Sequence, residues 1–279
     1  MFQTRRVLIW GKTYPELSWK SRETVCTGGC TEDGTPIRLY PVNLRYLQNH
    51  QQYGLYDWIE IPLERDKADP RPESHKVDAA RLKVIRRVGP QNGWAERRTV
   101  VFANRSWHYA CVEDLKGRQQ AGYHSLGIVP VGAVEDVRLV ERPHAERVKH
   151  ETKLAELRST IDLFGVEQKA LEFMPYRVHL RWRCQRLDGD RACPGHSAGV
   201  LDWGLMELMR RLGPLAAQQK MQELGDLQRY DLHLFVGNFF THQRVFGIIA
   251  LWYPLRSALA QTDLFTVPGV EGHRPAPCA

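Results

Sequence analysis

Residues 176–184 read YRVHLRWRC, and residues 193–213 read CPGHSAGVLDWGLMELMRRLG after a polar loop. The first run has apolar residues at alternate positions, the pattern of a half-buried strand: Val178, Leu180, Trp182 and Cys184. The second run has leucines at helical spacing: Leu201, Leu205, Leu208 and Leu212. Ser197 can cap this helix, and Gly213-Pro214 ends it. The stretch therefore predicts a strand, a tight turn at residues 193–196 (the knuckle) and a helix.

The knuckle has the spacing of a metal site. Cys193 and His196 are separated by two residues, one of them glycine, so a tight turn can bring both to one ion. Cys184 is well placed as a third ligand, and Cys26 or Cys30, or both, would complete the set from the first half of the chain. Three cysteines and a histidine suit zinc, with an iron–sulfur cluster as the alternative. The alternative without a metal is that these are ordinary buried cysteines.

Two further cysteines stand apart. Cys111 and Cys278 have no neighbour at ligand spacing. We therefore predict that neither is needed for the metal.

The rest of the sequence predicts an α+β protein. Residues 24–30 and 36–41 form a predicted hairpin around Asp33-Gly34, and further strands are predicted at 56–63 and within 125–140. Helices are predicted at 43–53, 78–88 and 94–102. This gives a β-rich, barrel-like domain at 1–140, a charged linker helix at 141–165, a smaller α/β domain with the Cys/His knuckle at 166–261, and a disordered tail at 262–279.

Composition indicates a soluble, cytosolic protein. The chain has 279 residues, of which 43% are hydrophobic and 25% charged. The apolar run after Arg5-Arg6 is too short for a signal peptide, and the longest apolar run, 245–253, is too short to cross a membrane. We expect a cytoplasmic location and no membrane partner.

The basic balance favours a nucleic-acid partner. Net charge is +7, and 29 of the 39 basic residues are arginine, whose planar fork suits phosphates and base edges. A GC-rich genome would also enrich arginine. The predicted contacts to DNA or RNA are polar or basic residues of the first half: Lys12, Arg71, Ser74, His75, Lys76, Arg86, Arg87, Arg97 and Arg98.

A metal-dependent enzyme is the rival hypothesis. Asp188, Asp190, Asp202 and Glu207 are the nearest carboxylates for a nuclease or hydrolase, but the last two are five residues apart and do not share a helix face. Four protein ligands would close the metal site, whereas three would leave a position for water. The sequence thus favours a zinc-containing, nucleic-acid-binding protein, a recognition or accessory subunit of a larger complex.

Overall fold

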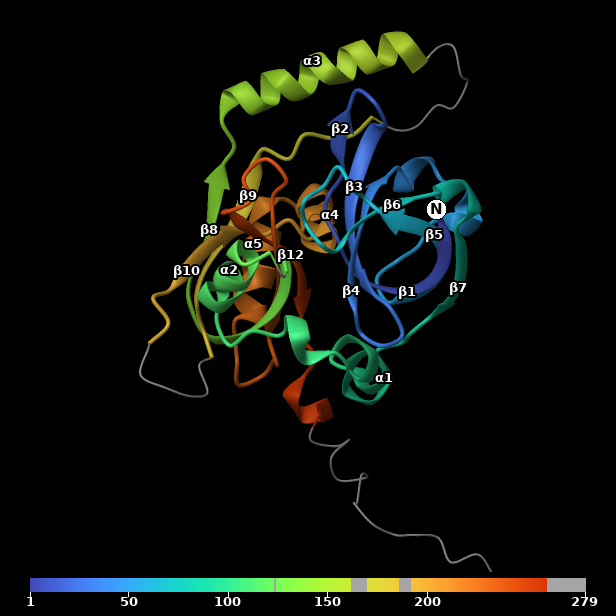
Figure 1. Ribbon diagram of the computed structural model, residues 1–279. Coiled ribbons are helices and arrows are strands. Elements are labelled where there is room, and N and C mark those ends of the chain that lie inside the picture. Colours follow the sequence, from blue (N-terminus) through green and yellow to red (C-terminus); the bar gives the residue numbers. More distant parts are fainter. Residues whose placement is uncertain (123, 162–169, 186–191, 260–279) are drawn as a thin grey trace, which may run out of the picture.

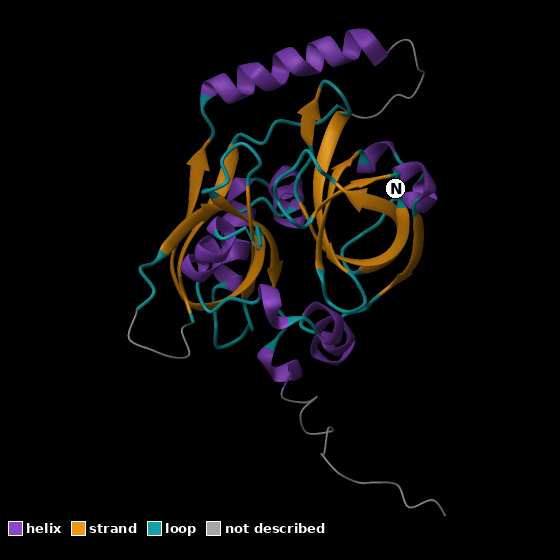
Figure 2. Ribbon diagram, in the orientation of Figure 1, coloured by secondary structure: helices purple, strands orange, loops and turns teal. Residues whose placement is uncertain are grey.

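A computed structural model describes residues 1–122, 124–161, 170–185 and 192–259. Two strongly curled sheets lie side by side, with helices packed around them (Figures 1 and 2). Helix α3 (His144–Ile161) runs across one end of the molecule, beyond both sheets (Figure 1). No helix in the described ranges is long and apolar enough to cross a membrane.

The first sheet closes into a barrel. Its strands are β1 (Gln3–Lys12), β2 (Glu16–Ser18), β3 (Arg22–Cys30), β4 (Pro36–Val42), β5 (Asp57–Arg65), β6 (Ser74–Val77) and β7 (Lys83–Arg87). The order is β1-β3-β4-β6-β5-β7, and β1 also pairs with β5, which closes the ring. Gly28 of β3 lies against the ring of Trp10, where any side chain would collide. The predicted barrel-like, β-rich first half is confirmed.

The second sheet has the order β10-β9-β8-β11-β12. Its strands are β8 (Leu126–Glu141), β9 (Tyr176–Cys184), β10 (His196–Gly199), β11 (His233–Asn238) and β12 (Phe246–Trp252). Val200, just after β10, bridges to Ile248 of β12, so this sheet also curls back on itself. Helices α4 (Trp203–Leu212) and α5 (Pro214–Leu224) pack together, and α5 lies against β8 and β9.

The two sheets share one core. Trp10 of β1 stacks on Phe235 of β11 with ring centroids 4.4 Å apart, and Trp107 packs beside both rings. The larger apolar cluster contains residues of both sheets. The predicted two-domain division is therefore only loosely present. In addition, β8 belongs to the second sheet, so a boundary at 140 would separate that strand from its partners.

A buried polar network also joins the sheets. The guanidinium of Arg38 on β4 donates to the hydroxyl of Ser125 (3.1 Å) and to the carbonyl of Asn238 (3.3 Å). The carboxylate of Glu73 accepts from the backbone N–H groups of Ser125 (2.6 Å) and Leu126 (3.1 Å). Each of these polar side chains is buried and needs a partner, which the opposite sheet supplies.

The loop before β6 adds a buried ion pair to this network. Arg71 Nη2 lies 2.6 Å from Asp69 Oδ2, and both side chains are 7% exposed. Arg71 Nη1 also donates to the carbonyl of Asn238 (3.1 Å), so the pair ties the barrel to the end of β11.

Several local predictions are correct. The hairpin of β3 and β4, the strands β5 and β9, and the charged helix α3 all form. Helix α5 begins at Pro214, as its fixed backbone angle favours. Residues 94–102 fall almost entirely in helix α1 (Gln91–Val101).

Other local predictions are wrong. Residues 78–88 form the 3-10 turn η3 (Ala79–Arg81) and strand β7, because pairing with β5 outweighs helix preference. Residues 43–53 hold only the turns η1 (Leu44–Tyr46) and η2 (Asn49–Gln51). The helix after the knuckle is capped by Asp202 rather than Ser197, because residues 196–199 pair with β9 as strand β10. The predicted tail at 262–279 lies outside the described residues.

Candidate metal centre

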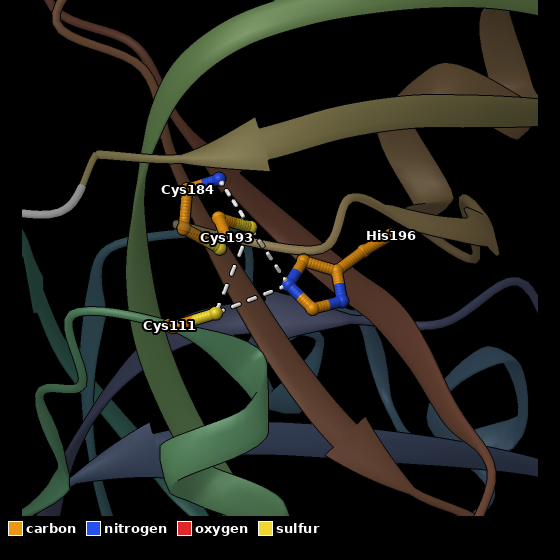
Figure 3. A group of neighbouring side chains, drawn as sticks. All are labelled: Cys111, Cys184, Cys193 and His196. Carbon is orange, nitrogen blue, oxygen red and sulfur yellow. Dashed lines mark hydrogen bonds between the residues drawn. The ribbon is translucent and has the colours of Figure 1, made fainter. Parts of the chain in front are cut away.

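Four side chains from separate elements meet at one end of the second sheet. Cys111 precedes helix α2 (Val112–Gln120) as its N-cap, Cys184 ends β9, and Cys193 and His196 flank the knuckle that opens β10. Figure 3 shows the three sulfur atoms and the imidazole turned toward one another. One ligand atom from each residue lies within 4.8 Å of all the others, so the group could hold a metal ion.

The distances match the requirements of one ion. Two sulfur ligands at about 2.3 Å from a tetrahedral zinc lie about 3.8 Å apart, and a sulfur and an imidazole nitrogen about 3.5 Å apart. The sulfur atoms of Cys111 and Cys193 are 3.7 Å apart. His196 Nε2 is 3.2 Å from each of these two sulfurs. These three ligand atoms are therefore nearly at the separations of a bound state, and the sulfur of Cys184 lies within 4.8 Å of each of them.

The backbone holds the knuckle in this shape. Gly195 has φ +85°, a left-handed conformation that glycine adopts without strain. Ladder pairing of His196 with Trp182 then fixes the start of β10 against β9. The backbone N–H of Cys184 donates to the sulfur of Cys193 at 3.3 Å.

Electrostatics favour metal binding by Cys193. Burial opposes its ionisation, but hydrogen bonds from the backbone N–H groups of Cys184 and Gly195 and contacts with the neighbouring thiols outweigh burial and lower its pKa. Burial raises the pKa of both Cys111 and Cys184. Burial also lowers the pKa of His196, which keeps the imidazole neutral and able to ligate. A cation at this point would favour the thiolate forms of the two raised groups.

A carboxylate and an indole ring lie beside the histidine. His196 Nδ1 lies 3.8 Å from the carboxylate of Glu113, while Nε2 faces the sulfurs. Lys116 donates to the same carboxylate at 2.6 Å, and the Trp182 ring packs 5.5 Å from the imidazole. A carboxylate behind a ligating histidine is a recurrent feature of metal sites because it fixes the tautomer and ring orientation.

The fourth member of the set differs from the prediction. Cys26 and Cys30 are not in the cluster, and Cys111 takes the place predicted for them. Cys30 is fully buried in the barrel, paired with Leu8, and Cys26 accepts a long hydrogen bond from Arg38 (3.9 Å). Cys111 has no neighbour at ligand spacing in the sequence, but the prediction that it stands apart from the candidate metal ligands is wrong, because the fold brings it into the cluster. The one signal available was its position before Glu113-Asp114, acidic residues typical of a first helical turn.

The nucleic-acid residues predicted in the first half mostly have other partners. Three of them are buried, namely Arg71, Ser74 and Arg97, and Lys12 and His75 are half-buried. The four exposed ones each form an ion pair: Lys76 with Asp66, Arg86 with Glu96, Arg87 with Asp57 and Arg98 with Asp231.

The carboxylates of the rival hypothesis are also occupied elsewhere. Asp202 is buried and accepts from the N–H of Leu205 as the cap of α4. Glu207 accepts from Arg210 and Arg211. Asp188 and Asp190 lie outside the described residues. Three cysteines and a histidine make four ligands, the number that a tetrahedral metal site takes.

Comparison with protein families places all four ligands in one region. Residues 3–103 match the domain of unknown function DUF8758, and residues 108–268 match the domain of unknown function DUF8757. Searches of curated proteins and of solved structures gave no match. The second match covers more than half of the 279 residues and contains Cys111, Cys184, Cys193 and His196, and the chain belongs to the DUF8757 family.

Proposed function

We propose that this protein binds single-stranded DNA or RNA and that a structural zinc ion stabilises its second sheet. It would serve as a recognition or accessory subunit rather than as a metalloenzyme. The zinc part and the nucleic-acid part rest on different observations.

Zinc is favoured by the ligand set and its spacing. Sulfur and imidazole ligands select soft or borderline ions, and a Cys₃His tetrahedron is a common structural zinc site. An iron–sulfur cluster would spread its ligands over several iron atoms, whereas here His196 Nε2 lies 3.2 Å from each of two sulfurs, which are 3.7 Å apart. Because four protein ligands close the site, a structural role fits better than catalysis.

The observation that supports nucleic-acid binding is the loop between β11 and β12. It presents two adjacent exposed phenylalanines, Phe239 (38% exposed) and Phe240 (54%), with the exposed residues His242 and Arg244. The buried guanidinium of Arg71 lies 5.6 Å from the centre of the Phe240 ring but is paired with Asp69, so the exposed arginine of this loop is Arg244. Aromatic faces beside arginines are what single strands use, because bases stack on the rings and phosphates attract the cations.

The Phe240→Ala variant tests this surface. Each stacked base contributes about 1–3 kcal/mol, so we expect at least about fivefold weaker binding to an unstructured oligonucleotide. Fluorescence anisotropy at several salt concentrations would measure it. For about four neutralised phosphates, the log–log salt slope should be near about −3.

Trp19→Ala is the matched control. Trp19 is 56% exposed in the turn between β2 and β3, so the variant removes an equally exposed aromatic from a different surface. Its affinity should equal that of the unmodified protein. If neither DNA nor RNA binds at low salt, the proposal fails and the loop is better explained as a protein-docking surface.

A further inference from the structure

A cavity between the barrel and helix α4 has the features of a ligand site. It has a volume of about 420 Å³, within the common range for small-molecule pockets. Its walls come from the end of β1, the segment before β2, turn η1, residues 170–172 and one face of α4 from its first turn to its last. These elements come from the barrel and from the second half of the chain, so the cavity exists only in the assembled chain.

A half-buried lysine points into this cavity. Lys12 Nζ donates to the carbonyl of Tyr53 (3.1 Å) and lies 4.6 Å from the centre of the Trp203 ring. An ammonium group has three donors. One is used by Tyr53, so others remain for a ligand in a place with little water to compete.

The walls beside Lys12 are flat and largely apolar. Tyr14 and Trp203 meet edge to face with centroids 6.4 Å apart, and Pro15 and Leu171 complete the apolar lining. The hydroxyl of Tyr14 is anchored to the carbonyl of Glu172 (3.3 Å), which fixes the ring. A planar ring can stack in such a slot.

The rim carries more cations than carboxylates. Lys12 and three arginines face Glu172 and Glu207. Glu207 accepts from both Arg210 (2.7 Å) and Arg211 (2.7 Å), so two arginines offset its charge. Arg211, which also lines the cavity, is 67% exposed and donates to Glu207 through Nε.

From this combination we propose that the cavity binds a nucleotide, with the base against Trp203 and Tyr14 and the phosphate on Lys12. The nucleotide could be a free nucleoside monophosphate or the phosphorylated end of a strand, which present the same chemistry. The site shares no residue with the β11–β12 loop, so it stands whether or not that loop binds nucleic acid.

Charges near Lys12 predict a pH profile. Burial lowers the pKa of Lys12 to about 8. The negative charges of Asp57 and Asp202 oppose this shift, and the positive charge of Arg87 adds to it. The pKa of Asp202 is raised by burial to about 6, and burial raises that of Tyr14 to about 12. A phosphate monoester is already a dianion above a pKa of about 6. Affinity should therefore fall as pH rises from 7 to 9.5, because Lys12 is the group that loses its charge in that window.

Calorimetric titration of the full chain with the four common nucleoside 5′-monophosphates tests the proposal. We expect one site at pH 7, at least about tenfold weaker in Lys12→Met because one charge-assisted contact is lost. Lys83→Met removes a lysine from the exposed face of β7 and is the matched control, with unchanged affinity. Trp203→Leu should weaken binding of nucleotides and leave weak binding of inorganic phosphate as it was.

Competition experiments with short oligonucleotides distinguish a free nucleotide from the end of a strand. Displacement by a 5′-phosphorylated trinucleotide, but not by its unphosphorylated form, identifies a strand end, and displacement by mononucleotides alone identifies a free ligand. Either result supports the site. Absence of binding, equal affinity for nucleosides without phosphate, or unchanged affinity in Lys12→Met would overturn it. Phe240→Ala should leave this titration unchanged, which separates failure of the site from failure of the loop.

Discussion

Replacing Cys111 with serine is expected to release the metal ion and to lower the melting temperature by about 10 °C or more. Structural zinc contributes on the order of 10 kcal/mol to small metal-dependent domains. Even half of that corresponds to a shift of about 10–20 °C in a chain of this size. The loss should be large because Cys111 sits at 0% exposure between the start of α2 and the end of β9. Elemental analysis of the purified protein and a thermal scan would measure both effects.

Cys26→Ser provides the matched control. It replaces a cysteine sulfur by oxygen in the barrel, away from the cluster. One metal ion per chain should therefore remain, whatever the effect on stability. A Cys111→Ser protein that keeps a full complement of zinc would show that the other three ligands suffice, and the site would then be open.

Asp69→Asn should cost about 3–5 kcal/mol of unfolding free energy. The change leaves the guanidinium of Arg71 buried at the junction of the two sheets without its counter-charge. Asp66→Asn is the matched control on the same loop. Its partner Lys76 is 52% exposed, so the ion pair contributes about 1 kcal/mol or less. Denaturant unfolding of the three proteins gives the comparison, and equal stability of the two variants would contradict a buried role for Asp69.

The same pair predicts acid sensitivity. Burial alone would raise the pKa of Asp69, but hydrogen bonds and charge from Arg71 outweigh it and lower the pKa from 3.8 to about 2. A depressed folded-state pKa contributes stability that is present above about pH 4 and is lost as pH falls toward 2. Asp69→Asn should therefore show a smaller loss of stability over that interval than the unmodified protein.

The elements with strong local patterns could be predicted from the sequence. Alternating apolar residues fixed β9, and the Cys-x-x-His spacing with glycine identified two ligands that do meet in space. Local pattern failed where long-range pairing decides the conformation. Residues 196–199 look like the start of a helix, but they pair with β9 and the helix starts only at Trp203.

Two features could be identified only from the fold: the fourth member of the Cys/His cluster, and the partners of the buried arginines. Cys111 is 73 residues before Cys184 in the sequence, and no spacing rule connects them. Arg71 and Arg97 are indistinguishable in the sequence from phosphate-binding arginines, yet Arg71 is neutralised by Asp69 and Arg97 donates to the carbonyl of Val88. Charge in a sequence therefore predicts surface chemistry only after burial and pairing are known.

The stack of Trp10 on Phe235 has a consequence for how the chain can be divided. The two family matches meet between residues 103 and 108, which suggests two exchangeable modules. However, each matched region supplies one ring of the Trp10–Phe235 stack and one partner of the Arg38–Ser125 hydrogen bond in the buried polar network. A barrel expressed without its neighbour would present Trp10 to water and leave the guanidinium of Arg38 without its oxygen acceptors at Ser125 and Asn238. Heat should accordingly melt both sheets in a single transition, and fragments cut near residue 105 should be recovered only when they are co-expressed.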